Sequence, residues 1–153
     1  MNIVKAMNEI GERLKRFPCY IQFDMMDCGP AALASIASYY GKEYGIPELR
    51  GYCFLTKDGV SLLGIEDAAR NIGFETLAVK TSVPKLYSKK PFPCILHWDN
   101  VHFVVLYNIR KSIVTGQRFF YMRVCHKSMA HPLLCYLLYN PRSIVAYSQK
   151  GII

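Results

Sequence analysis

The sequence has no aspartate or glutamate after Asp99. Over 153 residues the chain carries a formal net charge of +8, and seven of its Lys and Arg side chains stand in this acid-free stretch. The remaining 12 basic groups are nearly balanced by 11 acidic ones. The seven are spread thinly among apolar residues, whereas a surface that follows a phosphate backbone needs a continuous basic stripe. We therefore expect no nucleic-acid partner.

Long apolar runs and nucleotide-binding loops are also missing. A membrane-spanning helix needs about 18 consecutive apolar residues, and no such run occurs. The first sixteen residues alternate charged and apolar positions instead of forming the core of a signal peptide. The chain has no Walker-type glycine loop of the kind that binds ATP phosphates. The sequence thus predicts neither a membrane span nor an ATPase site.

The cysteines do not follow a pattern typical of disulfide frameworks or metal centres. They lack the tight, regular spacing of small secreted proteins, so we expect a reducing, cytoplasmic environment. In the tail, Cys125, His126, His131 and Cys135 do not have a recognised zinc spacing. We expect no metal and no cofactor. The six cysteines are residues 19, 28, 53, 94, 125 and 135.

The length fits one domain with additions at both ends. With 52% apolar and 13% aromatic residues, the chain can build one packed core and is too short for two ordinary domains. Apolar positions recur at helical spacing in residues 1–16, which we predict to be an amphipathic N-terminal extension. Residues 17–124 are predicted to form the domain, and residues 125–153 an atypical C-terminal tail.

Helical periodicity dominates the first half of the chain. Apolar positions at i, i+3, i+4 and i+7 predict a core helix over residues 28–40 and a second over residues 61–72. Gly41 and Gly73 then stand where a helix C-terminal stop is expected. Pro47 favours the start of a short helix between the two.

Strand patterns dominate the second half. Two such runs are separated by Asp99–Asn100, which suits a tight hairpin turn. Helices followed by strands favour an α+β domain, in which N-terminal helices pack on a C-terminal antiparallel sheet. The predicted strands, rich in β-branched and aromatic residues, are residues 75–79, 93–98, 101–108 and 118–124.

Cys28 stands at the predicted start of the first core helix, in the sequence QFDMMDCGPAAL. A thiolate, not a thiol, attacks carbonyl groups, and the unpaired N–H groups and dipole of a helix N-terminus stabilise a negative charge. Asp27 can cap the first turn, where Pro30 is tolerated. Free cysteine is also among the most buried residue types. The position alone therefore leaves both a nucleophile and a buried thiol open.

Two further residues can complete a cysteine peptidase site. Strand alternation places His102 on one face together with Val104 and Leu106, where it is either a core histidine or a base that takes a proton from Cys28. Gln22, six residues before Cys28, can donate a side-chain amide hydrogen bond to an oxyanion. Residue types alone do not choose between these roles.

The chain resembles the peptidase domain of bacteriocin-processing ABC transporters, the double-glycine leader peptidases, in the stretches YIQFDMMDCGPAAL, GVSLLGIEDAARNIGFET and PCILHWDNVHFVVLYNI. The resemblance covers residues 17–122 and implies a papain-like fold. It implies a cysteine endopeptidase, a hydrolase that removes a leader peptide after a Gly-Gly or similar pair during export. By matching position, Cys28 becomes the nucleophile, His102 the general base and Gln22 the oxyanion-hole side chain. The segment Asp58–Ile65 falls in the region that binds the leader.

The same resemblance implies partners and a location. The substrate is a double-glycine leader peptide, and in a full-length transporter membrane and ATP-binding domains accompany the peptidase at the cytoplasmic face of the bacterial inner membrane. This chain carries the pattern of neither domain, so it is expected to be free-standing or a truncated piece. Some relatives lack the cysteine and bind leaders without cutting them. A non-catalytic leader-binding module is therefore the alternative function.

One group that the resemblance implies is missing. In the family, an Asp-Pro pair after the second strand orients the histidine, but here Phe119–Met122 is followed by RVCHKSMAHP. Asn140, which precedes a proline, can serve instead. The site can also work as a Cys–His dyad, at a loss of roughly a few powers of ten in rate. In the third interpretation the tail is translated from a displaced reading frame or is rearranged. Sequencing the coding DNA tests this interpretation, which is excluded if neither of the other two frames encodes an Asp-Pro pair after residue 122.

Overall fold

The structure of the protein is a computed structural model, in which no side chain after Lys111 is described. The predicted N-terminal extension and the Asp99–Asn100 turn lie outside the described residues. Within the residues described, no helix has both the length and the apolar character needed to cross a membrane. The described backbone covers residues 17–54, 56–57, 59–98, 102–114, 117–125, 127–128 and 144–148.

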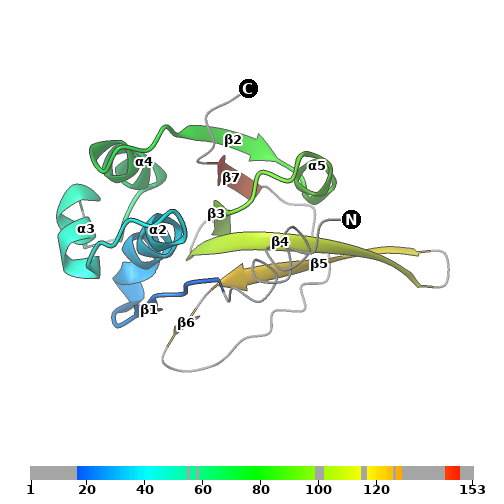
Figure 1. Ribbon diagram of the computed structural model, residues 1–153, viewed down its shortest axis with the longest axis horizontal. Helices are drawn as coiled ribbons and strands as arrows, with labels where there is room; N and C mark the ends of the chain where they lie inside the picture. Colours follow the sequence, from blue (N-terminus) through cyan, green and yellow to red (C-terminus); the bar gives the residue numbers. More distant parts are fainter. Residues whose placement is uncertain are drawn as a thin grey trace, which may run out of the picture.

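The three helices predicted in the first half are present (Figure 1). They are α2 (Cys28–Tyr39), α3 (Ile46–Tyr52) and α4 (Leu62–Asn71). Gly41 and Gly73, the predicted stops, have φ values of +78° and +84°. A further short helix, α5 (Val83–Lys89), was not predicted, because seven residues beginning Val-Pro give little periodicity to detect.

An antiparallel sheet forms the second half, so the predicted α+β architecture is confirmed. Three predicted strands agree with the structure to within a residue at their starts, and β2 begins two residues later than predicted. The strand β7, from the predicted tail, was not predicted; it pairs with both β2 and β3. In sheet order the strands are β2 (Leu77–Thr81), β7 (Ile144–Ser148), β3 (Cys94–Trp98), β4 (His102–Val114) and β5 (Gln117–Cys125).

A second, small sheet joins the beginning of the domain to the end of β5. In it β1 (Ile21–Gln22) pairs in parallel with β6 (Lys127–Ser128), and Gln22 is the register partner of Ser128. Because β6 follows directly after β5, this sheet ties the lead-in to α2 to the edge of the large sheet. The position of Gln22 therefore depends on both halves of the chain.

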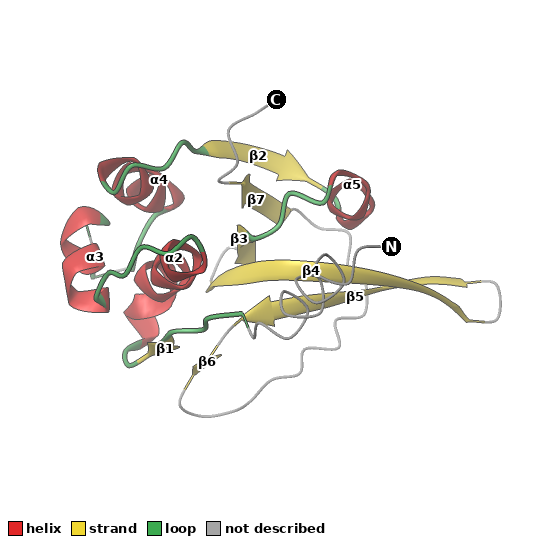
Figure 2. Ribbon diagram, in the orientation of Figure 1, coloured by secondary structure: helices red, strands yellow, loops and turns green. Residues whose placement is uncertain are grey.

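Helices cover both faces of the large sheet, with α2, α3 and α4 on one side and α5 on the other (Figure 2). On the first face, Phe103 and Val105 of β4 share a buried cluster with α2 and α4. On the opposite face, Val104 and Leu106 share a separate cluster with α5. This confirms the predicted alternation of β4 and shows that its two faces bury different cores.

The described cysteines are in two chemical states. Cys28, Cys53 and Cys94 are free and buried. Cys19 is disulfide-bonded, which the sequence analysis did not predict. A disulfide in this domain does not fit the simple expectation that all the cysteines stay reduced.

Candidate active site

Cys28 is the first residue of α2, as predicted, but the helix does not begin freely there. It continues from a 3-10 turn, η1 (Met25–Asp27), whose N-cap is Asp24. Asp24 accepts a hydrogen bond from the backbone N–H of Met26 at 3.2 Å. The prediction that Asp27 caps α2 is wrong, since Asp27 makes no such capping bond. The cap moves to Asp24 because the 3-10 turn adds residues before the helix.

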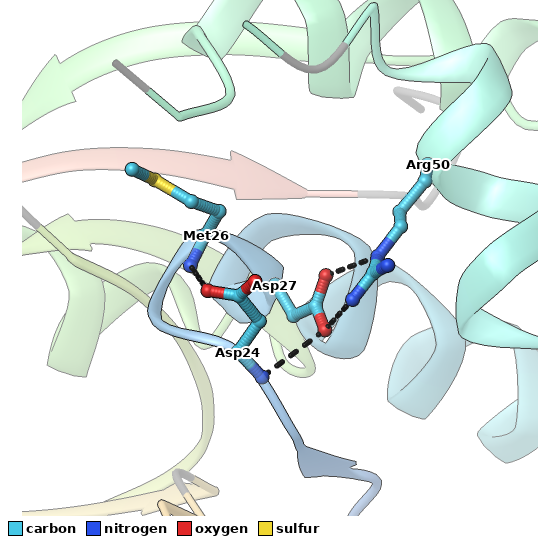
Figure 3. Close-up of polar contacts among 4 residues, drawn as sticks. All are labelled: Asp24, Met26, Asp27 and Arg50. Carbon is cyan, nitrogen blue, oxygen red and sulfur yellow. Dashed lines mark hydrogen bonds and ion pairs between the residues drawn. The ribbon is translucent and has the colours of Figure 1, made fainter. Parts of the chain in front are cut away.

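The carboxylate of Asp27 is used differently (Figure 3). It accepts hydrogen bonds from the backbone N–H of Asp24 at 3.3 Å and from both Nε and Nη2 of Arg50 on α3. Asp27 is 0% exposed, and its side-chain hydrogen bond raises the pKa of Arg50. Sequence reasoning missed Arg50. The one available signal was that a buried carboxylate needs a cation, and that does not say which of the many basic residues supplies it.

The lead-in to α2 brings Gln22 towards the Cys28 end of the helix. Phe17 stacks on Tyr39, the last residue of α2, at 5.4 Å between ring centroids. Further along, the backbone N–H of Tyr20 donates to Ser35 Oγ, in the middle of α2, at 3.0 Å. Residues 17–22 therefore run along α2 in the opposite direction to the helix. Gln22 comes next and is 8% exposed.

The elements that carry Cys28 and His102 pack against each other and each begins with its site residue. Phe17 stacks on both Tyr39 of α2 and Tyr107 of β4, at 5.4 and 4.9 Å, which joins the end of α2 to the middle of β4. Cys28 lies about 17 Å before Tyr39 along the helix, and His102 lies about 17 Å before Tyr107 along the strand. Phe103, the residue after His102, shares the buried cluster of Cys28. These contacts bring the starts of α2 and β4 to the same end of the packed layers.

Two histidines stand at this corner. The Nδ1 atom of His102 is buried, and strand alternation continues its side chain onto the face of Val104 and Leu106. His97, on β3, stacks on Phe103 at 4.3 Å on the α2 face, and burial lowers its pKa. The sequence analysis did not consider His97. It is the natural competitor of His102 for the role of base.

The segment Asp58–Ile65, predicted to bind the leader, packs directly on the first turn of α2, although Asp58 itself lies outside the described residues. A Cβ added at Gly29, the residue after Cys28, would lie 3.0 Å from Ile65 Cδ1 and 3.3 Å from Val60 Cβ. Glycine is thus the residue that lets the segment approach so closely. The predicted substrate region and the predicted nucleophile are immediate neighbours.

Neither of the described strands that follow β4 directly, β5 and β6, carries the orienting carboxylate that the family pattern implies. Asn140 lies outside the described residues, as do the side chains of Cys125, His126, His131 and Cys135. The antiparallel register sets Cys125 opposite Val105, so β5 runs back towards the start of β4. Because the sequence has no acidic residue after Asp99, neither β5 nor β6 can offer a carboxylate to His102.

Comparison with known proteins agrees with this geometry. Residues 16–115 match the model of the Peptidase C39 family. Over 109 residues the chain is 37% identical to the probable microcin-H47 secretion/processing ATP-binding protein MchF of Escherichia coli, which covers 71% of this chain and 16% of that protein. Over 62 residues it is 45% identical to the transport/processing ATP-binding protein ComA of Streptococcus pneumoniae, covering 40% of this chain and 9% of ComA.

Two solved structures are also similar. The peptidase domain of Streptococcus ComA superposes with a TM-score of 0.54 at 30% identity, covering 69% of this chain and 77% of that one. A double glycine motif protease from an AMS/PCAT transporter, solved in complex with the leader peptide, gives a TM-score of 0.62 at 26% identity, with 87% and 90% covered. The chain spans less than a fifth of the curated relatives MchF and ComA. It belongs to the peptidase C39 family and has the papain-like fold of the peptidase domains found in bacteriocin- and ComA-processing ABC transporters.

Proposed function

We propose that the protein is a cysteine endopeptidase that cleaves the double-glycine leader of an exported, bacteriocin-like peptide. The observation that carries the proposal is the path of the lead-in that ends at Gln22. The lead-in runs back along α2 through the Tyr20–Ser35 hydrogen bond, towards the helix end that begins with Cys28. A buried glutamine whose segment leads towards a helix-start cysteine suits the oxyanion hole of a thiol peptidase.

Each residue then has one task. The Cys28 sulfur attacks the carbonyl carbon before the scissile bond, and the developing oxyanion accepts hydrogen bonds from the Gln22 amide and a backbone N–H at Cys28. His102 takes the thiol proton and passes it to the leaving amine, which breaks the peptide bond and leaves a thioester on Cys28. Water, deprotonated by His102, then hydrolyses the thioester and restores the thiol.

Exposed apolar side chains support a leader-binding surface next to Cys28. Phe23, Phe54 and Leu63 are 76%, 69% and 62% exposed. Leu63 lies within the segment Asp58–Ile65, and Phe23 precedes η1, whose Met26 sulfur would lie 3.5 Å from a Cβ added at Gly59. Large exposed apolar side chains of this kind suit the apolar residues of a peptide ligand. The leader peptide bound by the transporter protease is the model for such a ligand.

The relatives suggest where this activity is used. MchF and ComA are named for secretion or transport together with processing. We propose that this domain likewise acts with the membrane and ATP-binding domains of an ABC transporter, at the cytoplasmic face of the inner membrane, whether those domains belong to the same protein or to another.

Incubation of the purified protein with a synthetic double-glycine leader peptide tests the proposal. Mass spectrometry should find cleavage after the Gly-Gly pair by the wild-type chain and none by Cys28→Ala. A peptide with bulky residues in place of the pair should stay intact, because a narrow cleft admits only small side chains before the scissile bond.

Binding without product, at high enzyme concentration, would support the alternative instead. The chain would then be a leader-binding module, an interpretation favoured by one observation, the absence of any carboxylate after Asp99. Fluorescence anisotropy with a labelled leader separates this outcome from a chain that does not bind the peptide at all.

A further inference from the structure

The residue before Cys28 carries a fully buried carboxylate. Asp27 is joined to Cys28 by a peptide bond, and both oxygens of its side chain are hydrogen-bonded by Arg50 (Figure 3). Oδ2 also accepts from the backbone N–H of Asp24. Asp24 is two residues after Gln22. One carboxylate thus connects α3, the turn after Gln22 and the start of the helix that begins with Cys28.

From this network we propose that Arg50 and Asp27 form a positioning pair for the active site: Arg50 fixes the Asp27 carboxylate, and Asp27 fixes the turn that sets Gln22 against Cys28. The consequence for catalysis rests on the proposed peptidase function. The consequence for the reactivity of the Cys28 thiol does not.

The turn needs such a clamp because it has few other restraints. Between β1 and α2 lie only Phe23, Asp24 and η1. Among the described residues, the hydrogen bonds of this short stretch are made within it or with Arg50. A five-residue connection can change shape without disturbing either end. Since an oxyanion donor acts only at about 3 Å from the oxygen that it stabilises, a shift of the turn would weaken the Gln22 contact first.

Arg50 is a suitable anchor because α3 is held firmly. A Cβ at Gly64 would lie 2.3 Å from the backbone oxygen of Cys53, so α4 touches the end of α3 with no space between them. Leu49, next to Arg50, is fully buried in the core cluster that contains Cys28. The guanidinium fork therefore starts from a fixed point, and its two parallel hydrogen bonds determine both the place and the orientation of the carboxylate.

The pair also removes a charge that would oppose catalysis. A buried carboxylate one residue from Cys28 repels a thiolate, and the interaction is strong where water is excluded. The positive Arg50 neutralises this charge at the same place. A loss of positioning should lower kcat, whereas a loss of charge balance should lower the alkylation rate of Cys28. A set of variants separates these two effects.

Four variants test the proposal. Arg50→Met removes charge and hydrogen bonds, Arg50→Lys keeps the charge but loses the fork, and Asp27→Asn/Arg50→Met removes the carboxylate as well. Arg70→Met is the matched control, because Arg70 makes an exposed i,i+4 ion pair with Glu66 on α4. For each we measure kcat and KM on the leader peptide, the rate of Cys28 alkylation by iodoacetamide from the mass of its tryptic peptide, and the melting temperature.

The expected results distinguish position from charge. Arg50→Met should lower kcat by about 100-fold with KM changed by less than about 3-fold, as for a small misplacement of reacting groups. It should slow Cys28 alkylation by about 10-fold, because the carboxylate is left uncompensated. Arg50→Lys should recover most of the alkylation rate and about a tenth of the wild-type kcat. The double variant should recover alkylation but not kcat, and Arg70→Met should change neither.

Two results would overturn the proposal. One is an Arg50→Met chain whose kcat and Cys28 alkylation both stay within twofold of wild type. The other is an equal loss in Arg50→Met and Arg70→Met, which would indicate a general effect of removing an arginine. If Arg50→Met does not melt cooperatively, Arg50→Lys and the double variant decide by the same criteria. If the wild-type chain cleaves no leader, the proposed function fails alone and the alkylation rates still test the pair.

Discussion

The two sides of the candidate site are built differently. The nucleophile side, residues 17–73, holds Gln22 and Cys28 through a stacked aromatic, a hydrogen bond from the lead-in to α2, and the Asp27–Arg50 pair. The base side, residues 94–125, holds His102 at the first position of β4, where its register partner is Trp98 at the last position of β3. The contacts on the first side come from α2 and α3, and the pairing on the second side places His102 at the end of the β3–β4 strand pair.

This difference indicates where catalytic sensitivity should lie. On the nucleophile side each contact holds a different segment, whereas His102 lies at the end of a strand pair, where backbone pairing opens most easily. The sequence also has no acidic residue after Asp99, so neither β5 nor β6 can direct a carboxylate at the base side. We therefore expect the largest losses of rate from changes on the base side.

The largest expected effect tests which histidine is the base. His102→Gln should lower kcat by about 10³- to 10⁴-fold on the leader peptide, because a proton acceptor is removed. His97→Phe keeps a ring to stack on Phe103 and should change kcat by less than about 3-fold if His97 is only a packing residue. The reverse pattern would move the base to β3 and contradict the assignment of His102.

A second prediction compares the free thiols on the two sides. Burial raises the pKa of both Cys53 and Cys94 from 9.0 to about 12. At pH 8 their thiolate fraction, and so their alkylation rate, should be about 10³-fold below that of an ordinary thiol. Iodoacetamide should therefore label Cys28 before Cys53 and Cys94 in the native chain, as read from tryptic peptide masses. Equal labelling of Cys28 and Cys94 would show that the helix start gives no advantage over a sealed strand.

A third prediction concerns the restraint on Gln22. Gln22→Ala should lower kcat by about 100-fold and leave KM within about 3-fold, because an oxyanion donor acts in the transition state and not in substrate binding. The comparison with Ser35→Ala sharpens it, since that change removes the hydroxyl that accepts from the Tyr20 N–H in the lead-in and donates to the Ala31 carbonyl within α2. Ser35→Ala should lower kcat by less than about 10-fold. An equal loss in both variants would mean that the nucleophile side depends on a single contact after all.

The smallest effect is on stability at alkaline pH. Cys53 and Cys94 ionise near pH 9 in the unfolded chain and near 12 in the folded one, so their contribution is complete below pH 9 and is lost as pH rises towards 12. Each thiol should lower the free energy of unfolding by up to about 1.4 kcal/mol per pH unit in that range. Urea unfolding at pH 9 and 10 measures the change.

Alanine variants separate the two thiols from the other groups that titrate there. The stability advantage of wild type over Cys53→Ala, and over Cys94→Ala, should shrink between pH 9 and 10. A smaller response for one thiol would identify the side of the domain that admits water more easily, and no response for either would show that neither is sealed.

Local pattern was enough to predict the helical half and the main strands. The helix over residues 28–40 was predicted from apolar side chains that recur with the helical period. In the structure, most of the residues of α2 are buried. The same reasoning found Cys28, Gln22 and His102 only as candidates, because the distance between them depends on how α2 packs on β4. The resemblance to a known family, not the periodicity, assigned them roles.

The failures have physical causes. The cap was predicted at Asp27 because a 3-10 turn before a helix leaves no mark on apolar periodicity. Arg50 was missed because an ion pair across 23 residues is a tertiary choice among many basic side chains. The strand β7 was missed because it pairs with strands more than 45 residues earlier in the sequence. Each depends on contacts that no local window contains.

The place of β7 has a consequence for the order of folding. Its two neighbours, β2 and β3, are close in sequence but do not pair with each other, because β7 lies between them in the sheet. The ribosome makes β7 roughly fifty residues after β3. On the ribosome, the helices can pack early, while a gap persists in the sheet until residues 144–148 emerge. Non-local pairings of this kind slow folding and expose strand edges meanwhile. The nascent chain is therefore expected to need protection from a chaperone for as long as that gap stays open.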